Sequence, residues 1–293
     1  MELRHIRYFL AVAEERHFTR AAARLGIAQP PLSQQIKDLE REIGAPLFHR
    51  IPQGAELTAA GAVFLDRIRI VPGQVADAVA ETQRAARGEI GSIRVGFTGS
   101  AAFNPRVPAA IRTFRRRFPD VELSLIEANS NGLVDALRTG ALDVAFLRPE
   151  GIARDGLTLL PIDVEPMIAA LASSRMPHGD PIALADLSGD PFVVTPRLLG
   201  PTLYDTTVEA CRRAGFEPIL GQSAPQVASV LALVAAELGV ALVPASMRDT
   251  PMKGVTYHDL TDTHATASLA LATRRGERSP VVTVFAEATR LVA

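Results

Sequence analysis

The hydrophobic periodicity of the chain changes twice along its length, and this limits the possible folds more than any other feature. Residues 1–57 hold short helical patterns separated by glycines, and residues 58–88 form one long helical pattern. From Ser92 onward, short β-rich runs alternate with amphipathic helices, as in α/β domains. The sequence therefore predicts a small helical domain, a connecting helix and a larger α/β domain.

Length and composition agree with this division. The chain has 293 residues, of which 47 % are hydrophobic and 22 % charged, which is typical of globular proteins with more than one domain. The 31 Lys and Arg residues are balanced by 32 Asp and Glu residues, for a formal net charge of −1. Any DNA binding must therefore come from a local surface and not from a general basic field.

Cysteine content and apolar runs bear on the compartment. Cys211 is the only cysteine, which excludes an internal disulfide and a thiolate zinc site. The apolar run 8–13 is too short for the core of a signal peptide. The apolar window 227–246 contains Glu237, a glycine and a proline, which favours a buried helix followed by a strand over a membrane span. We expect no membrane association and a cytoplasmic location.

Residues 18–37 have the pattern of two short helices joined by a sharp turn. The first helix is rich in alanine and reaches Gly26, which allows the turn. Pro30 and Pro31 suit the first turn of the second helix, where a missing N–H costs nothing. Apolar residues at helical spacing form the expected buried stripe of this helix: Leu32, Ile36, Leu39 and Ile43.

An adjacent face of the second helix carries groups that can contact DNA. Its amide, hydroxyl and ammonium groups suit base edges and phosphates, and they belong to Gln29, Ser33, Gln34 and Lys37. Residues 46–57 predict a hairpin wing whose Arg50 could contact phosphate or the minor groove. The alternative is a helical hairpin with solvated polar residues. Net charge does not distinguish the two interpretations, because residues 1–57 hold 8 Lys and Arg residues against 7 Asp and Glu residues.

The long pattern 58–88 predicts a helix for self-association. Thr58 is the expected N-cap. Spacings of three and four residues form a seam close to that of a coiled coil, made of Phe64, Ile68, Val71, Val75, Val79, Thr82 and Ala86. Pro72 and Gly73 interrupt the pattern and predict a kink. The alternative is an ordinary surface helix packed on its own domain.

Two similar passages in the α/β region predict two doubly wound lobes. Each passage reads strand, helix, strand, over 92–97, 104–118 and 121–126 and again over 191–195, 202–214 and 218–220. Further elements are a helix over 131–139 closed by Gly140, a strand over 142–146, a helix from Ser223 or Ala224 to Leu238 and a strand over 240–243. Open α/β sheets bind ligands at the carboxyl ends of their strands.

Polar side chains stand where these strands lead into helices. These side chains are Ser100, Asn129, Ser130 and Thr202. Because they would lie beside unpaired helix N–H groups, we expect them to bind a carboxylate. Arg148 follows a strand and could add a bidentate partner. The alternatives are plain N-caps for the hydroxyls and a surface ion pair for Arg148. The basic run 115–117 is expected to be a solvated helix face, and Cys211 to be unreactive.

Enzyme motifs do not occur in the sequence. There is no G-x-S-x-G, H-E-x-x-H, Walker loop or G-x-G-x-x-G, and the six histidines are scattered without the spacing of metal ligands. We expect no catalysis, no metal and no cofactor apart from a small-molecule effector.

The opening Met-Glu-Leu-Arg-His-Ile-Arg-Tyr-Phe, the helix-turn-helix 18–37 and the segment Leu-Phe-His-Arg…Leu-Thr-Ala-Ala-Gly resemble the LysR-type transcriptional regulators. The resemblance covers the whole chain. Segments 86–91, 96–100, 146–148 and 233–246 resemble regulators of aromatic-acid degradation and of organic-acid or acetoin metabolism. It implies an N-terminal all-α winged helix-turn-helix domain (1–57) and a linker or dimerisation helix (58–88). An α/β effector domain like type 2 periplasmic binding proteins follows (89–293), with lobe I about 89–162 and 266–293 and lobe II about 163–265.

The resemblance implies a sequence-specific DNA-binding regulator that responds to a small anionic metabolite bound between the lobes. Its implied partners are an interrupted palindrome in double-stranded DNA, a second copy in a homodimer or homotetramer, and RNA polymerase. The DNA-binding set becomes Thr19, Arg20, Gln29, Pro30, Pro31, Ser33, Gln34, Lys37 and Arg50. This chain departs from the family pattern at Gln53, where many members have a second basic residue in the wing.

Three implied effector positions, Ser100, Ser130 and Arg148, match those that hold the acid in muconate- and benzoate-responsive members. Asn129 and Thr202 complete the polar set, and the apolar lining matches Pro196, Pro201, Leu203 and Val227. An aromatic acid, a muconate-like diacid and an acetate-sized acid are all open. The alternatives are an effector-independent regulator with a vestigial pocket, and a solute-binding protein with an accessory N-terminal module.

Overall fold

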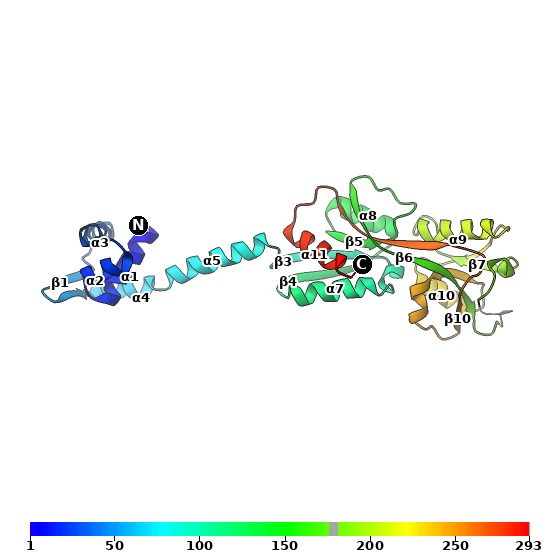
Figure 1. Ribbon diagram of the computed structural model, residues 1–293, viewed down its shortest axis with the longest axis horizontal. Coiled ribbons are helices and arrows are strands. Elements are labelled where there is room, and N and C mark those ends of the chain that lie inside the picture. The colour runs from blue at the N-terminus through cyan, green and yellow to red at the C-terminus, as the bar shows by residue number, and fades with distance from the viewer. Residues whose placement is uncertain (176–180, 293) are drawn as a thin grey trace. The chain divides into compact units, whose positions relative to one another are not determined.

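A computed structural model describes residues 1–175 and 181–292 and divides the chain into two compact units, Met1–Gln83 and Arg84–Ala293 (Figure 1). In the first unit, α1 (Leu3–Glu15) precedes α2 (Phe18–Leu25) and α3 (Gln29–Ile43), and a hairpin follows, of β1 (Phe48–Ile51) and β2 (Gly54–Leu57). Gly26 ends α2 with a φ of 68°, and prolines occupy the first turn of α3. The predicted helix-turn-helix and wing are confirmed.

The core of the first unit joins all of its helices to the wing. Leu32, Ile36 and Leu39 of α3 are buried, as predicted, but Ile43 is exposed because it is the last residue of the helix. The ring of Phe9 in α1 lies 4.8 Å from that of Phe64, measured between centroids. Residues of the connecting region therefore belong to this core.

The helical pattern over 58–88 is interrupted, as predicted from Pro72 and Gly73, but it is divided into two helices and not merely kinked. Helix α4 (Ala59–Ile68) begins at Thr58, whose side chain caps it as predicted, and α5 (Val71–Ala86) follows after a break. Pro72 is the second residue of α5, where no intrahelical N–H bond is lost. The chain is therefore interrupted just before the proline, and α5 starts afresh.

The predicted self-association seam is divided between two environments. Phe64 and Ile68 pack into the core of the first unit, and Val71 is partly buried against it. Val75 and Val79 are exposed, and none of the described residues of α5 is buried. Phe64 and Ile68 are thus core residues of their own domain, contrary to the prediction.

The second unit begins with a mixed sheet that forms lobe I. Its strands are β3 (Gly91–Phe97), β4 (Val121–Glu127), β5 (Val144–Leu147), the first half of β6 (Leu157–Ala172) and β11 (Thr266–Arg274). β3 pairs in parallel with β4 and β5, whereas β11 pairs antiparallel with β5 and β6. Helices α7 (Arg106–Arg117) and α11 (Pro280–Arg290) cover one face, and α8 (Ser130–Thr139) covers the other.

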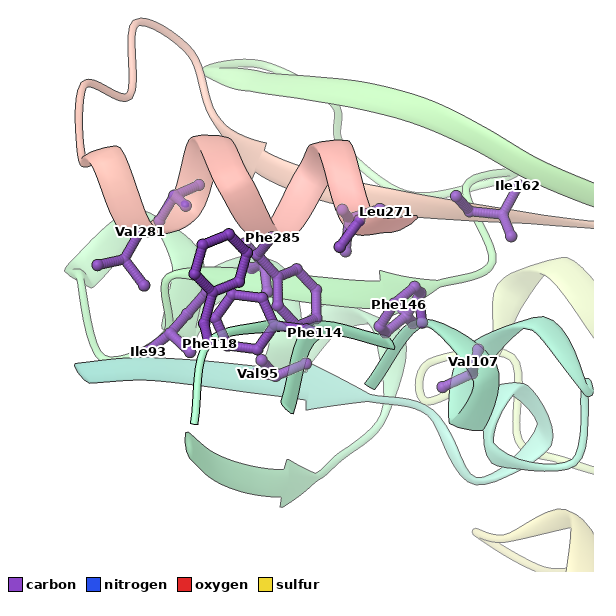
Figure 2. Close-up of a cluster of buried hydrophobic side chains, with 14 of the residues drawn as sticks. Ile93, Val95, Val107, Phe114, Phe118, Phe146, Ile162, Leu271, Val281 and Phe285 are labelled. Atoms are coloured by element: carbon purple, nitrogen blue, oxygen red, sulfur yellow. The ribbon is translucent and has the colours of Figure 1, made fainter. Parts of the chain in front are cut away.

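Aromatic side chains fill the space between the sheet of lobe I and its helices. Figure 2 shows Phe114 and Phe118 of the α7 region meeting Phe285 of α11 above the sheet. The rings of Phe114 and Phe285 lie 4.9 Å apart, and that of Phe146 on β5 lies 6.1 Å from Phe285. This core holds the strand ends that carry the site in place.

Lobe II is built on the second half of β6. That half pairs with β9 (Ala241–Pro244) and β10 (Val255–His258), while β7 (Pro191–Val194) pairs in parallel with β8 (Ile219–Ser223). Helix α9 (Pro201–Arg213) packs on one side and α10 (Val227–Ala235) on the other. α10 is shorter than predicted, because Ser223 belongs to β8 and Glu237 takes a positive φ of 62°.

The two lobes are not separate sheets. The 16 residues of β6 run from one lobe into the other, a strand that the sequence patterns did not predict. Among the described residues, no helix is long and apolar enough to cross a membrane.

Candidate functional site

The first unit presents most of the predicted DNA-contacting side chains to solvent. Gln29 is half-buried, and the exposed members are Thr19, Arg20, Pro30, Pro31, Gln34, Lys37 and Arg50. The Gln34 amide nitrogen donates to an Asp38 carboxylate oxygen at 3.0 Å, so this amide is held along α3. The polar face predicted for α3 is therefore available at its N-terminal end.

Ser33 differs from this set because it is buried. Its Oγ accepts a hydrogen bond of 2.6 Å from Nη2 of Arg50, and the Arg50 guanidinium carbon lies 4.5 Å from the centroid of the Phe18 ring. A guanidinium over an aromatic face is stabilised by the ring quadrupole. Ser33 therefore connects α3 to the wing. The sequence had suggested a free hydroxyl that reads a base, and the structure differs from this prediction.

The second unit has a partly open cavity of about 40 Å³ beside the carboxyl ends of β3, β4, β5 and β7. Most predicted effector residues line it: Ser100, Asn129, Ser130, Arg148, Thr202, Leu203 and Val227. Eight lining residues were not predicted: Thr98, Gly99, Ala128, Thr195, Leu199, Gly200, Pro225 and Gln226. The pair Thr98-Gly99, at the end of a strand, was the local signal that could have found the first two.

Pro196 and Pro201 are not part of the lining, contrary to the prediction. The Pro196 carbonyl accepts the amides of Leu199 and Gly200, so this turn places those two residues at the cavity instead. Pro201 is buried, and a methyl group on Gly151 would stand 2.9 Å from its Cβ. Pro201 is the first residue of α9, and Pro196 lies in the turn that precedes this helix.

Helix N-termini from both lobes converge on the cavity. α8, α9 and α10 each place their first residues in its lining, as does the short α6 (Gly99–Ala102). The Asn129 side chain accepts the amide of Gly132 at 2.9 Å, which leaves the Ser130 and Asn131 amides without a partner inside the helix. Thr98, not Ser100, caps α6. Such amides and the helix dipoles favour an anion.

Arg148 is buried in the cavity wall with a side-chain exposure of 2 %. Nε donates to Ser100 Oγ at 3.2 Å, and Nη2 donates to Glu165 Oε1 at 2.8 Å and to the Ser100 carbonyl at 3.4 Å. Nη1 donates to the carbonyls of Ala267 and Ser268 at 3.1 and 3.4 Å. All five N–H donors of a guanidinium thus have protein acceptors. Arg148 is neither the free bidentate partner nor the surface ion pair considered from the sequence.

Glu165 balances this buried charge from β6. Burial alone would raise the pKa of Glu165, but the adjacent guanidinium of Arg148 and the Ser246 amide, which donates to Oε2 at 2.9 Å, hold that pKa below its ordinary value. Asn104 also donates to Oε1 at 3.2 Å. Glu165 therefore connects the cavity wall of lobe I to Ser246 in lobe II.

Two further hydrogen bonds join the lobes beside the cavity. The Thr202 hydroxyl at the start of α9 lies 2.6 Å from the Glu150 carbonyl and 3.1 Å from that of Arg148, and it donates to this pair. The Asn131 amide donates to the Leu198 carbonyl at 2.8 Å. Thr202 is therefore an interlobe contact and not the plain N-cap considered from the sequence.

The remaining candidates have ordinary roles. Arg115, Arg116 and Arg117 are exposed on α7, as predicted. Burial raises the pKa of the Cys211 thiol to about 11, which agrees with the expectation of an unreactive cysteine. In the described part of the chain, no group of three or more His, Cys, Asp or Glu side chains could hold a metal ion.

Both units match known protein families. Residues 3–62 match the bacterial regulatory helix-turn-helix proteins of the lysR family, and residues 86–292 match the LysR substrate binding domain. The transcriptional regulator BudR of Raoultella terrigena is 43 % identical over 290 residues, covering 98 % of this chain and 99 % of BudR. AlsR of Bacillus subtilis (strain 168) is 36 % identical over 286 residues, covering 97 % and 94 %.

A solved structure of full-length CbnR with its target DNA has a TM-score of 0.85 and 28 % identity, covering 100 % of this chain and 99 % of that one. Its fold and domain order agree with those described above. The relatives are named as transcriptional regulators and not as enzymes. The chain therefore belongs to the LysR family: it is a DNA-binding transcriptional regulator with an N-terminal helix-turn-helix and a C-terminal substrate-binding domain for a small-molecule effector.

Proposed function

We propose that the cavity of the second unit binds a small carboxylate and that this binding changes how the protein engages its operator. The observation that carries the proposal is the convergence of helix N-termini from both lobes on one partly open cavity. Unpaired amides, helix dipoles and the hydroxyls of Ser100 and Ser130 suit an anion with oxygen acceptors.

Ligand binding would act on the relative position of the lobes. Ser100 and Ser130 come from lobe I, whereas Thr202, Leu203 and Val227 come from lobe II. A ligand that contacts both sets of residues stabilises the arrangement of the lobes in which both sets reach it. It shifts the equilibrium between lobe arrangements only by the difference in its affinity for them.

The DNA-binding half of the proposal uses the exposed end of α3 and the wing. Base and phosphate contacts come from Gln29, Pro30, Pro31, Gln34, Lys37, Thr19, Arg20 and Arg50, with Ser33 positioning Arg50. Two such units read an interrupted palindrome in a homodimer or homotetramer that associates through the exposed Val75 and Val79 of α5. RNA polymerase is the proposed downstream partner, and the DNA-binding role supports a cytoplasmic location.

A footprint on the DNA immediately upstream of the protein's own gene tests both halves. The full chain is added alone and with single carboxylates, and thermal unfolding is recorded with the same acids. We expect a protected interrupted palindrome whose footprint changes with an acid that also raises the unfolding temperature. Protection that no acid changes, without thermal stabilisation, would support the vestigial pocket instead. A chain that binds neither this DNA nor a distant operator selected from genomic fragments would contradict the DNA-binding half.

A further inference from the structure

We infer that Arg16 contacts a DNA phosphate beside the wing. Arg16 follows the last residue of α1, in the turn before α2, and it is not among the DNA-contacting residues proposed above. The inference rests on the DNA-binding half of the proposed function, since it adds a contact at the edge of the surface formed by α3 and the wing. Three features carry it, namely a left-handed backbone, a contact with the wing and an unpaired cation.

The first feature is a backbone conformation that is unfavourable for a residue with a side chain. Arg16 ends α1 with a φ of 50° and a ψ of 25°, which is the left-handed region. Glycine is the usual residue in this conformation at the end of a helix, because a Cβ atom is crowded there. A strained residue that glycine could replace without loss to the fold points to a function of its side chain.

The second feature is the contact between this turn and the wing. The Arg16 carbonyl accepts the amide of Ala55 at 2.8 Å, and Ala55 is paired with Arg50 in the hairpin. A methyl group on Gly54 would collide with the Arg16 carbonyl, so glycine permits this close approach. Strand β2 therefore lies between the two arginines, and the usual strand spacing places their Cα atoms about 10 Å apart. Arg16 thus stands at the edge of the wing, near the arginine proposed to contact phosphate.

The third feature is that the Arg16 guanidinium is free. The side chain is exposed, and in the described part of the chain it has no ion pair and no hydrogen bond. The carboxylates that precede it are occupied by other arginines. Arg20 lies 3.8 Å from Glu15, and Arg24 pairs with Glu14 and Glu15. Arg16 can therefore bind a phosphate of the duplex without the loss of an internal partner.

Three substitutions of Arg16 separate its charge from its backbone conformation. Arg16→Gln removes the charge and keeps a side chain, Arg16→Lys keeps the charge, and Arg16→Gly removes both the charge and the strain. Binding of the full chain to operator and non-operator DNA is measured by fluorescence anisotropy at several salt concentrations. We expect Arg16→Gln and Arg16→Gly to lose about fivefold or more in affinity for both DNAs, because a phosphate contact carries no sequence information. The slope of log K against log salt concentration should fall by about 0.9 for each DNA-binding unit engaged, and Arg16→Lys should keep the parent slope.

Stability and a distant charge provide the controls. Glycine relieves the left-handed backbone, so the unfolding temperature of Arg16→Gly should be at least that of the parent protein while its DNA affinity falls. A loss of fold then cannot explain the loss of binding. Arg4→Gln is the matched control, because it removes one exposed positive charge from the first turn of α1, about 18 Å from Arg16 along the helix axis. We expect it to leave the salt slope unchanged.

The outcomes distinguish this inference from the function on which it rests. An affinity and a salt slope of Arg16→Gln equal to those of the parent would overturn the inference and leave DNA binding standing. The same holds if Arg4→Gln lowers the slope as much, because net charge would then explain the effect, or if Arg16→Lys loses as much as Arg16→Gln. A defect confined to the operator would show that Arg16 reads a base and not a phosphate. If the parent protein binds neither DNA, the DNA-binding half of the proposed function itself fails.

Discussion

At the scale of single residues, the buried pair of Arg148 and Glu165 joins the ligand cavity to lobe II. Arg148 lies against Ser100 in the cavity wall, and Glu165 accepts the amide of Ser246 beyond it. A buried ion pair of this kind adds little to stability over an apolar pair, but removal of one partner leaves a charge in a medium that does not solvate it. The pair is therefore sensitive to the loss of either member.

Replacement of Glu165 by Gln is expected to destabilise the effector domain by about 3–5 kcal/mol at pH 7, because Arg148 loses its counter-charge. Folding lowers the pKa of Glu165 below its ordinary value of 4.5, so its contribution is present above that value and is lost as the pH falls through the folded pKa. Urea unfolding at pH 7 and near pH 4 should show this loss in the parent protein and less of it in the variant. Equal stability of Glu165→Gln and parent at pH 7 would refute the role of the pair.

Ser33 and Arg50 form the corresponding pair in the DNA-binding unit. Because Ser33 acts by holding Arg50, we expect Ser33→Ala to weaken operator binding by about 1 kcal/mol and non-operator DNA binding equally. In Arg50→Ala, the further change Ser33→Ala should have little effect, since the two act together. Gel shifts on both DNAs measure this. Gln34→Ala is the comparison, since loss of a base contact should reduce operator binding alone. A Ser33→Ala defect confined to the operator would show that Ser33 reads a base.

At the scale of elements, α5 is a helix that its own chain covers chiefly at Val71, its first residue. Its 16 residues include none that is buried among those described, and isolated helices of this length are marginal in water. Val75 and Val79 lie one turn apart with exposures of 37 % and 52 %. An apolar stripe on such a helix requires a partner to cover it.

The double change Val75→Asp and Val79→Asp is expected to reduce self-association by at least about tenfold in the dissociation constant, because it places charges in the apolar stripe. Analytical ultracentrifugation measures the effect, and circular dichroism checks the fold of both units. Ala80→Asp is the control, because it adds a charge to the same helix outside the stripe. If the control dissociates as much as the double variant, charge in general and not the stripe is responsible.

At the scale of the whole molecule, the proposed function requires that ligand binding change the relation between the lobes. β6 joins the lobes covalently, and Thr202 and Asn131 add hydrogen bonds across the cavity mouth. These bonds stabilise the arrangement in which residues of both lobes line the cavity. Their strength therefore sets part of the affinity for the effector.

Thr202→Val keeps the shape but removes the donor to the Glu150 and Arg148 carbonyls, which costs about 1–3 kcal/mol when carbonyls are left unpaired. We expect effector affinity to fall about fivefold or more and DNA binding without effector to be unchanged. Calorimetry and a gel shift check the two halves. Thr207→Val is the matched control, because Thr207 donates only within α9, to the Leu203 carbonyl at 2.8 Å. An equal loss in both variants would show that α9 itself is perturbed.

Much of the fold follows from signals that act over a few residues. A glycine at positive φ ends α2 and α8, Thr58 caps α4, and prolines begin α3. Capping, turn preference and amphipathic spacing are local free energies, so the sequence by itself determined the helix-turn-helix, the wing, most helix boundaries and which strand ends carry the cavity.

The partners of the polar side chains were decided by the tertiary structure alone. Arg148 meets Glu165 because the pairing of β11 with β6 places Glu165 opposite Ala267, whose carbonyl Arg148 also contacts. Thr202 reaches a carbonyl 52 residues earlier because the start of α9 lies beside the end of β5. The residue types were visible in the sequence, but hydrogen bonds across such separations depend on sheet register and packing, which no local preference encodes. The sequence therefore determined where the cavity lies, and the tertiary structure decided that its arginine is already neutralised.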